Sequence, residues 1–222
     1  ERACTRAAAR ELKTPLAVLR AHGEALKEDI DPARRGEYLD VVLSESDRMA
    51  ALVGRLLALS RMEGDGPPKR EPVRFAALVG EVFTRLALPM EQKGLHVTRS
   101  LQSGEVWGDR ARLERAVEEL AANALRYTPA GGAVSVRLAR RGEALRLTVD
   151  NDGANFTTEE LAHLWERFYR GDPSRSRSTG GAGLGLAMVK AAVEAQGGRC
   201  GAENRSGGVR FWLELPSLQS DG

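Results

Sequence analysis

The chain has 222 residues, enough for one or two domains that each bury a core, and two is the favoured number. Its 33 basic and 31 acidic residues leave a net charge of +2, which argues against nucleic acid as the main partner. No run approaches the roughly 18 apolar residues of a membrane-spanning helix, and two distant cysteines argue against a disulfide framework. We therefore expect a soluble, cytoplasmic chain. We also expect it to be a piece of a longer protein, because it starts inside a helical pattern without an initiator Met.

The first 63 residues predict a helical hairpin. Residues 2–29 are rich in helix formers, and their leucines recur at spacings typical of an amphipathic helix. Asp31 and Pro32 suit the start of a second helix that runs to about residue 62. One isolated hairpin cannot bury both apolar stripes, so we expect a homodimer that forms a four-helix bundle. The stripes comprise Leu12, Leu16, Leu19 and Leu26, and then Leu39, Val42, Met49, Leu52, Leu56 and Leu59.

Residues 64–72 are predicted to be a linker, because Gly64 and the prolines after it break the helix. The pattern then changes for residues 73–222. Two stretches indicate helices, 75–88 and 110–127, and four show the period of two that is typical of strands: 95–101, 133–139, 144–151 and 209–215. This mixed order predicts an α+β two-layer sandwich with helices on one face of a sheet.

Residues 10–15 read Arg-Glu-Leu-Lys-Thr-Pro and resemble the H-box of two-component sensor histidine kinases at every position except the first. In that family a histidine at this first position attacks the γ-phosphate of ATP, and Arg10 stands in its place. The resemblance implies that Glu11 positions or deprotonates the nucleophile and that Thr14 orients water when a response regulator is dephosphorylated. Because arginine stays protonated and offers only donors, Arg10 cannot replace the histidine as nucleophile.

Residues 119–129 resemble the N-box of the same family and lie on the predicted helix 110–127. Residues four apart share a helix face, so Glu119 and Asn123 project together. The resemblance implies that Asn123 binds Mg²⁺ through its carbonyl oxygen, with Glu119 beside the metal, and that Arg126 and Tyr127 lie near the phosphates. Many histidine kinases have Asn where Glu119 stands. Glutamate there is usual in the related gyrase, Hsp90 and MutL ATPases, where it polarises the attacking group.

Residues 149–156 resemble the G1 box, which contacts adenine in this family. Aligning Gly153 with the first glycine of the box puts Asn151 at the adenine-binding position and Asn155 at the second glycine. An Asn amide can still accept a hydrogen bond from the exocyclic amine of adenine. Asp152 is the alternative contact if the loop shifts by one residue.

Residues 165–170 resemble the F-box, and residues 180–186 resemble the G2 box, whose glycines let backbone amides approach phosphates at the start of a helix. The implied phosphate-binding residues are Gly181, Gly183, Leu184 and Gly185, with a helix expected over 184–196. The polar stretch 171–179 is expected to be the lid over ATP.

The chain is thus identified as resembling the cytoplasmic core of a sensor histidine kinase, a Bergerat-type or GHKL ATP-binding domain preceded by a dimerisation and histidine-phosphotransfer hairpin. This implies ATP and Mg²⁺ as cofactors and a response regulator receiver domain as partner. It also implies a bacterial inner-membrane sensor whose membrane contact lies only in a missing N-terminal region. Two alternatives stay open: a natural pseudokinase that acts as a dimeric scaffold or regulator phosphatase, and a hydrolytic ATPase of the MutL or gyrase type.

Overall fold

The computed structural model describes residues 2–64, 68–169 and 182–218. The chain divides into two compact units, Glu1–Ser60 and Arg61–Gly222, each of which is treated by itself. None of the helices among the described residues is long and apolar enough to cross a membrane.

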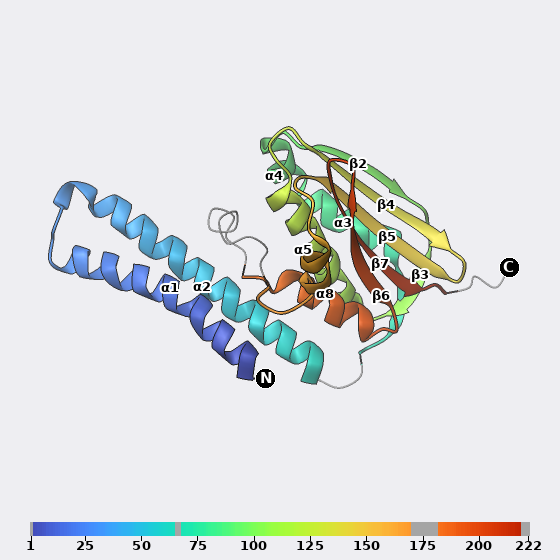
Figure 1. Ribbon diagram of the computed structural model, residues 1–222, viewed down its shortest axis with the longest axis horizontal. Coiled ribbons are helices and arrows are strands. Elements are labelled where there is room, and N and C mark those ends of the chain that lie inside the picture. Colours follow the sequence, from blue (N-terminus) through green and yellow to red (C-terminus); the bar gives the residue numbers. More distant parts are fainter. Residues whose placement is uncertain (1, 65–67, 170–181, 219–222) are drawn as a thin grey trace. The chain divides into compact units, whose positions relative to one another are not determined.

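The first unit is an antiparallel helical hairpin, as predicted (Figure 1). Helix α1 (Arg2–Lys27) and helix α2 (Arg35–Gly64) are joined by a turn that includes the short 3-10 helix η1 (Pro32–Arg34). The Asp31 carboxylate accepts a hydrogen bond from the Ala33 amide at 3.2 Å, which caps η1. Near the turn, the His22 ring of α1 lies edge-on to the Tyr38 ring of α2, with centroids 5.6 Å apart.

Helix α2 carries two apolar stripes rather than the one that we expected. Leu52 and Leu59 are buried, as is typical of the inner face of a hairpin. Leu39, which we had placed on that face, is instead exposed, because the angle between positions 39 and 52 separates them around the helix. It belongs to a second stripe with Leu43, Val53 and Leu57, and these side chains and Leu16 of α1 are each 43–64% exposed.

The second unit is a two-layer sandwich, which confirms the predicted fold class. Its described part contains a five-stranded sheet of order β2-β4-β5-β7-β6, with β2 parallel to β4 and the other neighbours antiparallel. The strands are β2 (His96–Leu101), β4 (Ala133–Arg141), β5 (Ala144–Asp152), β6 (Arg199–Arg205) and β7 (Gly208–Pro216). Two short strands, β1 (Glu71–Arg74) and β3 (Glu105–Gly108), form a separate antiparallel pair.

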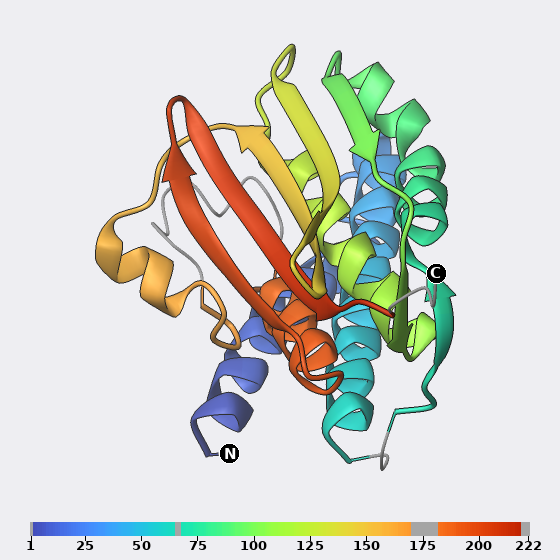
Figure 2. The same ribbon diagram turned by 90° about the vertical axis from the view of Figure 1, so that its right-hand side faces the viewer.

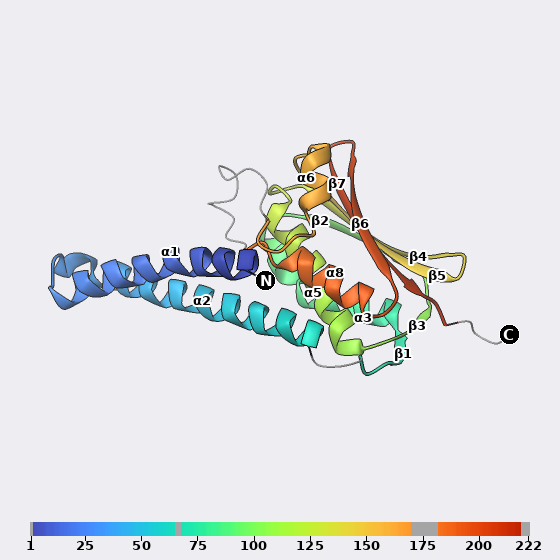
Figure 3. The same cartoon turned by 60° about the horizontal axis from the view of Figure 1, so that its bottom comes forward.

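Helices α3 (Phe75–Arg85), α5 (Arg110–Tyr127) and α8 (Gly185–Glu194) cover one face of the sheet (Figures 2 and 3). The shorter helices are α4 (Ala87–Gln92) and α6 (Thr158–His163). The core lies between the layers, where Leu147 and Val149 of β5 pack in one cluster with Leu120 of α5 and Val193 of α8. The helix expected over 75–88 is interrupted after residue 85.

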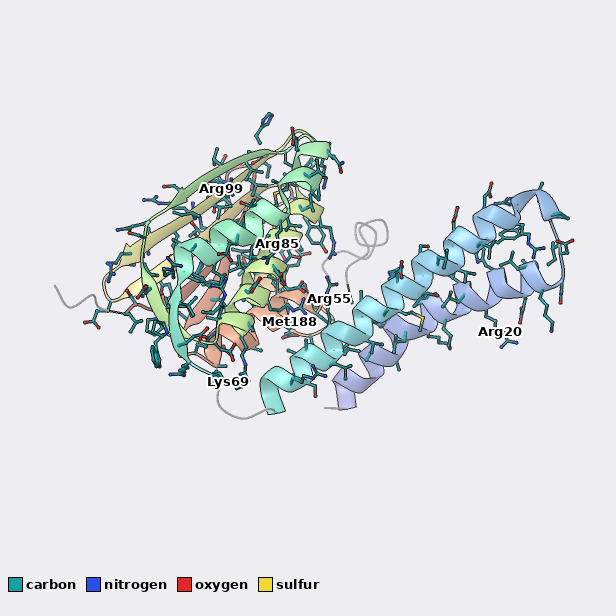
Figure 4. The ribbon with its side chains drawn as sticks, turned by 180° about the vertical axis from the view of Figure 1, so that it is seen from behind. Arg20, Arg55, Lys69, Arg85, Arg99 and Met188 are labelled. Atoms are coloured by element: carbon teal, nitrogen blue, oxygen red, sulfur yellow. The ribbon has the colours of Figure 1, made fainter. Side chains whose placement is uncertain are left out.

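Polar contacts between surface side chains fix α3 to its neighbours. The Arg85 guanidinium, labelled in Figure 4, donates to Glu114 at 2.7 Å and to Glu118 at 3.0 Å, both on α5. Arg99 of β2 donates to the Thr84 hydroxyl of α3 at 3.1 Å. These contacts link α3 to α5 and to the edge strand β2. Each exposed ion pair contributes little stability.

The opposite face of the sheet carries a nearly buried carboxylate. Glu214 of β7 lies between Arg146 of β5 and Arg199 of β6, and each arginine Nε donates to one carboxylate oxygen at 2.5 Å. Burial alone would raise the pKa of the Glu214 carboxyl, but the hydrogen bonds from Arg199 and Arg146 hold this pKa below its usual value. The charged form of Glu214 therefore stabilises the folded state.

We expect Glu214→Gln to lower the free energy of unfolding by about 1–2 kcal/mol at pH 7, because two charge-assisted hydrogen bonds are weakened. The folded-state pKa is depressed, so the contribution of Glu214 is complete above the usual glutamate pKa and is lost as pH falls through the lower, folded value. Urea denaturation between pH 7 and pH 3 measures this difference. All three tryptophans lie in the second unit, so their fluorescence follows that unit alone.

The matched control is Glu203→Gln on the neighbouring strand, where the Glu203 side chain is 53% exposed and pairs with Arg210 at 3.2 Å. This control should change stability little at any pH. A loss for Glu214→Gln that is the same at pH 3 as at pH 7 would contradict the proposed linkage.

Candidate functional site

Helix α5 carries Glu119 and Asn123 and places Glu119 at the start of α8. Glu119 is buried and Asn123, one turn further on, is half-buried on the same helix. A methyl group built at Gly185, the first residue of α8, would lie 2.6 Å from Oε2 of Glu119. The absence of a side chain at Gly185 therefore lets the Glu119 carboxylate lie against the α8 N-terminus, where unpaired amides favour negative charge.

Three backbone carbonyls at the C-terminal end of α5 accept hydrogen bonds from outside the helix ladder. The backbone amide and hydroxyl of Thr128 both donate to the Ala124 carbonyl, at 3.1 and 2.6 Å. The Lys93 ammonium donates to the carbonyls of Leu125 at 2.7 Å and Arg126 at 3.0 Å. Lys93 thus satisfies helix-end carbonyls that would otherwise need water. Lys93 was not among the predicted residues, because it stands alone in the sequence, outside any of the boxes.

Arg126 and Tyr127 lie at this same end of α5. The Arg126 guanidinium is 6.0 Å from the centre of the Tyr127 ring, and Tyr127 is exposed. The backbone at this end of α5 lies beside the loop after β5, because a methyl built at Gly153 would lie 3.4 Å from the Tyr127 carbonyl oxygen.

The register of β5 distinguishes Asn151 from Asp152. Successive side chains of a strand alternate between faces, so Asn151 points to the helix side with Leu147 and Val149. Asn151 is only 3% exposed, and its side-chain amide nitrogen donates to the Asp152 carbonyl at 3.1 Å. The side-chain oxygen of Asn151 therefore points away from that carbonyl and can accept from another group. The Asp152 carboxylate accepts from the Ala133 amide at 2.8 Å on β4. Asn151 is therefore better placed than Asp152 to contact a ligand on the helix side of the sheet.

The segments that resemble the F-box and the G2 box are joined by a hydrogen bond from the Phe168 amide to the Gly183 carbonyl at 2.7 Å. Both residues adopt left-handed backbone conformations, with φ of 62° and 67°. A side chain at Gly183 would collide with the backbone of Tyr169, 2.6 Å from its carbonyl oxygen, so glycine is required there. Gly181 and the expected lid, 171–179, lie outside the described residues.

Leu184 and Gly185 form the start of α8. Leu184 is buried and occupies the N-cap position without a side-chain hydrogen bond to the helix. The first amides of α8 thus depend on groups other than a capping side chain, which is an arrangement suited to phosphate oxygens.

The predicted residues of the hairpin lie on α1. Arg10 and Thr14 are exposed and, four positions apart, share one face of the helix, whereas Glu11 is half-buried. This face of α1 is exposed within the hairpin.

The donor set at α5 fits Mg²⁺ bound together with a nucleotide better than a dedicated metal cage. Among the described residues, no group of three or more His, Cys, Asp or Glu side chains is arranged to hold a metal ion. Mg²⁺ in nucleotide sites needs only one or two hard oxygen ligands from the protein, since phosphates and water supply the rest. The carbonyl oxygen of Asn123 and the carboxylate of Glu119 meet that requirement.

Two family models match the chain. One, the His Kinase A (phospho-acceptor) domain, matches residues 1–65. The other, the histidine kinase-, DNA gyrase B-, and HSP90-like ATPase, matches residues 108–219, which is about half of the chain.

Individual proteins are similar over nearly the whole chain. The sensor protein SphS of Synechococcus elongatus is 39% identical over 223 residues, which cover 96% of this chain and 54% of SphS. The chain thus spans about half the length of the curated relatives it matches. The solved structure of the histidine kinase AdeS of Acinetobacter baumannii superposes with a TM-score of 0.73 at 25% identity, covering 94% of this chain and 98% of AdeS. The histidine kinase ThkA, in complex with the response regulator protein TrrA, shares the fold with a TM-score of 0.77 at 20% identity, covering 96% and 61%.

Proposed function

The chain belongs to the sensor histidine kinases of two-component systems, and we propose that it binds ATP with Mg²⁺ and signals to a response regulator, but does not phosphorylate itself. The observation that carries the nucleotide site is the meeting of three segments distant in sequence. The end of α5 lies beside the loop after β5 at Gly153, and Glu119 of α5 lies against the start of α8 at Gly185.

Each side chain has a proposed task. Asn151 accepts a hydrogen bond from the adenine amine, because it lies at the end of β5 on the helix side of the sheet. Asn123 and Glu119 would hold Mg²⁺, which would supply positive charge to offset the negative charge of the phosphates. Arg126 and Tyr127 lie near the phosphates. Within the described residues, the amides at Gly183, Leu184 and Gly185 approach the phosphate oxygens.

Nucleotide binding should therefore depend on Asn123. We expect the unmutated chain to bind ATP in a Mg²⁺-dependent manner and Asn123→Ala to weaken binding at least tenfold, since one hard oxygen ligand is lost. Isothermal titration calorimetry measures both. Arg115→Ala is the control, because Arg115 also lies on α5 and forms an exposed ion pair with Glu118. No heat of binding from the unmutated chain with Mg²⁺ would refute the proposed nucleotide site.

Arg10 is proposed to prevent autophosphorylation. Phosphoryl transfer needs a nucleophile with a free lone pair in line with the γ-phosphate, and most of its catalysis is positioning and charge stabilisation. The guanidinium has no usable lone pair at any working pH. His22 is a poor substitute, because it lies about 18 Å further along the helix at 1.5 Å per residue.

Replacing Arg10 by histidine should restore the reaction. With ATP labelled on the γ-phosphate and Mg²⁺, Arg10→His should accumulate an acid-labile phosphohistidine, whereas the unmutated chain should incorporate no label. Arg10→Gln, which removes the charge without adding a nucleophile, should stay unlabelled, and Arg10→His combined with Asn123→Ala should lose the label. Equal labelling of the unmutated chain and Arg10→His would show that another residue is the acceptor.

A receiver domain of a response regulator is the proposed partner. Glu11 and Thr14 are retained, and Thr14 is exposed beside Arg10. The unmutated chain therefore fits a second candidate function, a scaffold or phosphatase that acts on the phosphorylated regulator. Mixing it with a phosphorylated receiver domain distinguishes the two, because a phosphatase speeds loss of the label and a scaffold does not. We propose that the full-length protein adds a membrane sensor region, which cell fractionation would test.

We also propose that the chain is a homodimer through the hairpin. The exposed stripe Leu39, Leu43, Val53 and Leu57 recurs at the spacing of a coiled-coil seam, and leaving it in water is unfavourable. A second copy of the hairpin supplies the same stripe and completes a four-helix bundle.

Leu43→Asp combined with Leu57→Asp should convert the dimer to a monomer at micromolar concentration, since two charges are placed in the apolar seam. Multi-angle light scattering measures the mass. The control, Ser44→Asp with Ala51→Asp, adds the same two charges at exposed positions of α2 outside the stripe and should remain dimeric. A monomeric unmutated chain would rule out the bundle.

A further inference from the structure

The loop after β5 is held by the turn of another hairpin, far from it in sequence. Figure 2 shows the chain that leaves β5 passing the tip of the hairpin formed by β6 and β7. The Gly153 amide donates to the Gly207 carbonyl in that tip at 3.1 Å. A methyl built at Gly208 would lie 2.1 Å from the Asn151 carbonyl oxygen, so only glycine permits this approach. We call residues 151–156 the base loop and residues 204–208 the hairpin tip.

Asn204, in the hairpin tip, contacts the base loop through both the oxygen and the nitrogen of its side-chain amide. Its oxygen accepts from the Phe156 amide at 2.9 Å, and its nitrogen donates to the Phe156 carbonyl at 2.6 Å. This pair of hydrogen bonds replaces those that a neighbouring strand would make to an extended residue. The Asn204 side chain therefore satisfies both backbone groups of Phe156, the last residue of the base loop.

Asn155 makes the reciprocal connection. With its amide nitrogen facing the hairpin tip, Asn155 donates to the carbonyls of Gly208 at 2.7 Å and Arg205 at 3.2 Å. The family pattern has glycine at this position. The φ of Asn155 is not positive, so its backbone conformation does not require glycine. The side chain at position 155 thus adds a tether that glycine lacks.

We propose that Asn204 and Asn155 are positioning residues for nucleotide binding, which hold the base loop in its binding conformation before ATP arrives. The inference rests on the proposed function, because it takes Asn151 as the adenine contact. Neither amide needs to touch the nucleotide. Both are exposed, so they contribute more to the order of this loop than to the core of the unit.

The expected effect follows from populations. If only a fraction of molecules has the base loop in place, the apparent dissociation constant rises by the inverse of that fraction. Losing the two hydrogen bonds of the exposed Asn204 side chain changes such an equilibrium by about tenfold. Once the nucleotide saturates the site, the loop is ordered again. The substitutions should therefore raise KM and leave kcat unchanged.

Calorimetric titration with ADP and Mg²⁺ tests this in the whole chain. Asn204→Ala should raise the dissociation constant about tenfold. Asn204→Asp should have a smaller effect, because the carboxylate still accepts from the Phe156 amide. Asn155→Gly should also weaken binding, although it restores the glycine of the family pattern. In the Arg10→His background, Asn204→Ala should raise KM for ATP with kcat within about twofold.

Leu101→Ala is the control for a general loss of stability. Leu101 packs against the core from β2, at the edge of the sheet opposite β6. It should lower the melting temperature without raising the ADP dissociation constant of the folded protein. Equal ADP affinity for the unmutated chain, Asn204→Ala and Asn155→Gly would overturn the inference and leave the proposed function intact. Absence of ADP binding by the unmutated chain would instead overturn the proposed function, and the inference with it.

Discussion

The pairing of β5 on both of its edges is the constraint on which the candidate site depends. Strand β5 lies between β4 and β7, and its register continues without interruption to Asn151 on the β4 edge and to Asp152 on the β7 edge. A shift of one residue would exchange every side chain between the two faces. It would move the Asn151 side chain to the face of the sheet that carries the ion pairs of Glu214, and the Asp150 side chain to the face covered by the helices. The chemistry of the loop is therefore set by hydrogen bonds along the whole strand.

Much of this fold could be predicted, because its largest elements have strong periodic patterns. Helix α5 matches its predicted bounds, and the strands with clear alternation were found. The strands β1 and β3 were missed because four residues show too little periodicity. Strand β6 was missed because it contains Gly201, which the Trp212 ring of β7 covers so closely that a side chain would collide with it. Helix α3 ends earlier than predicted, and Pro89 is accommodated in the first turn of α4.

The site was predictable only in part, for a different reason. Glu119 and Asn123 lie on one helix face by spacing alone, so their proximity follows from the sequence. Lys93 and Asn204 act through backbone carbonyls and amides that lie 32 and 48 residues away. Backbone groups are the same in every residue, so no residue pattern marks such partners. The choice between Asn151 and Asp152 likewise needed the strand register, since both residues can accept a hydrogen bond.

The contact between Gly185 and Glu119 couples the two positions. A methyl group at position 185 would meet the far end of a side chain rather than backbone, so the carboxylate could swing aside and the fold would survive. The damage would fall on the position of the carboxylate, which would leave its place against the start of α8. Alanine at position 185 is therefore a substitution that the fold accepts and the candidate site does not, and a shorter side chain at position 119 would relieve the clash.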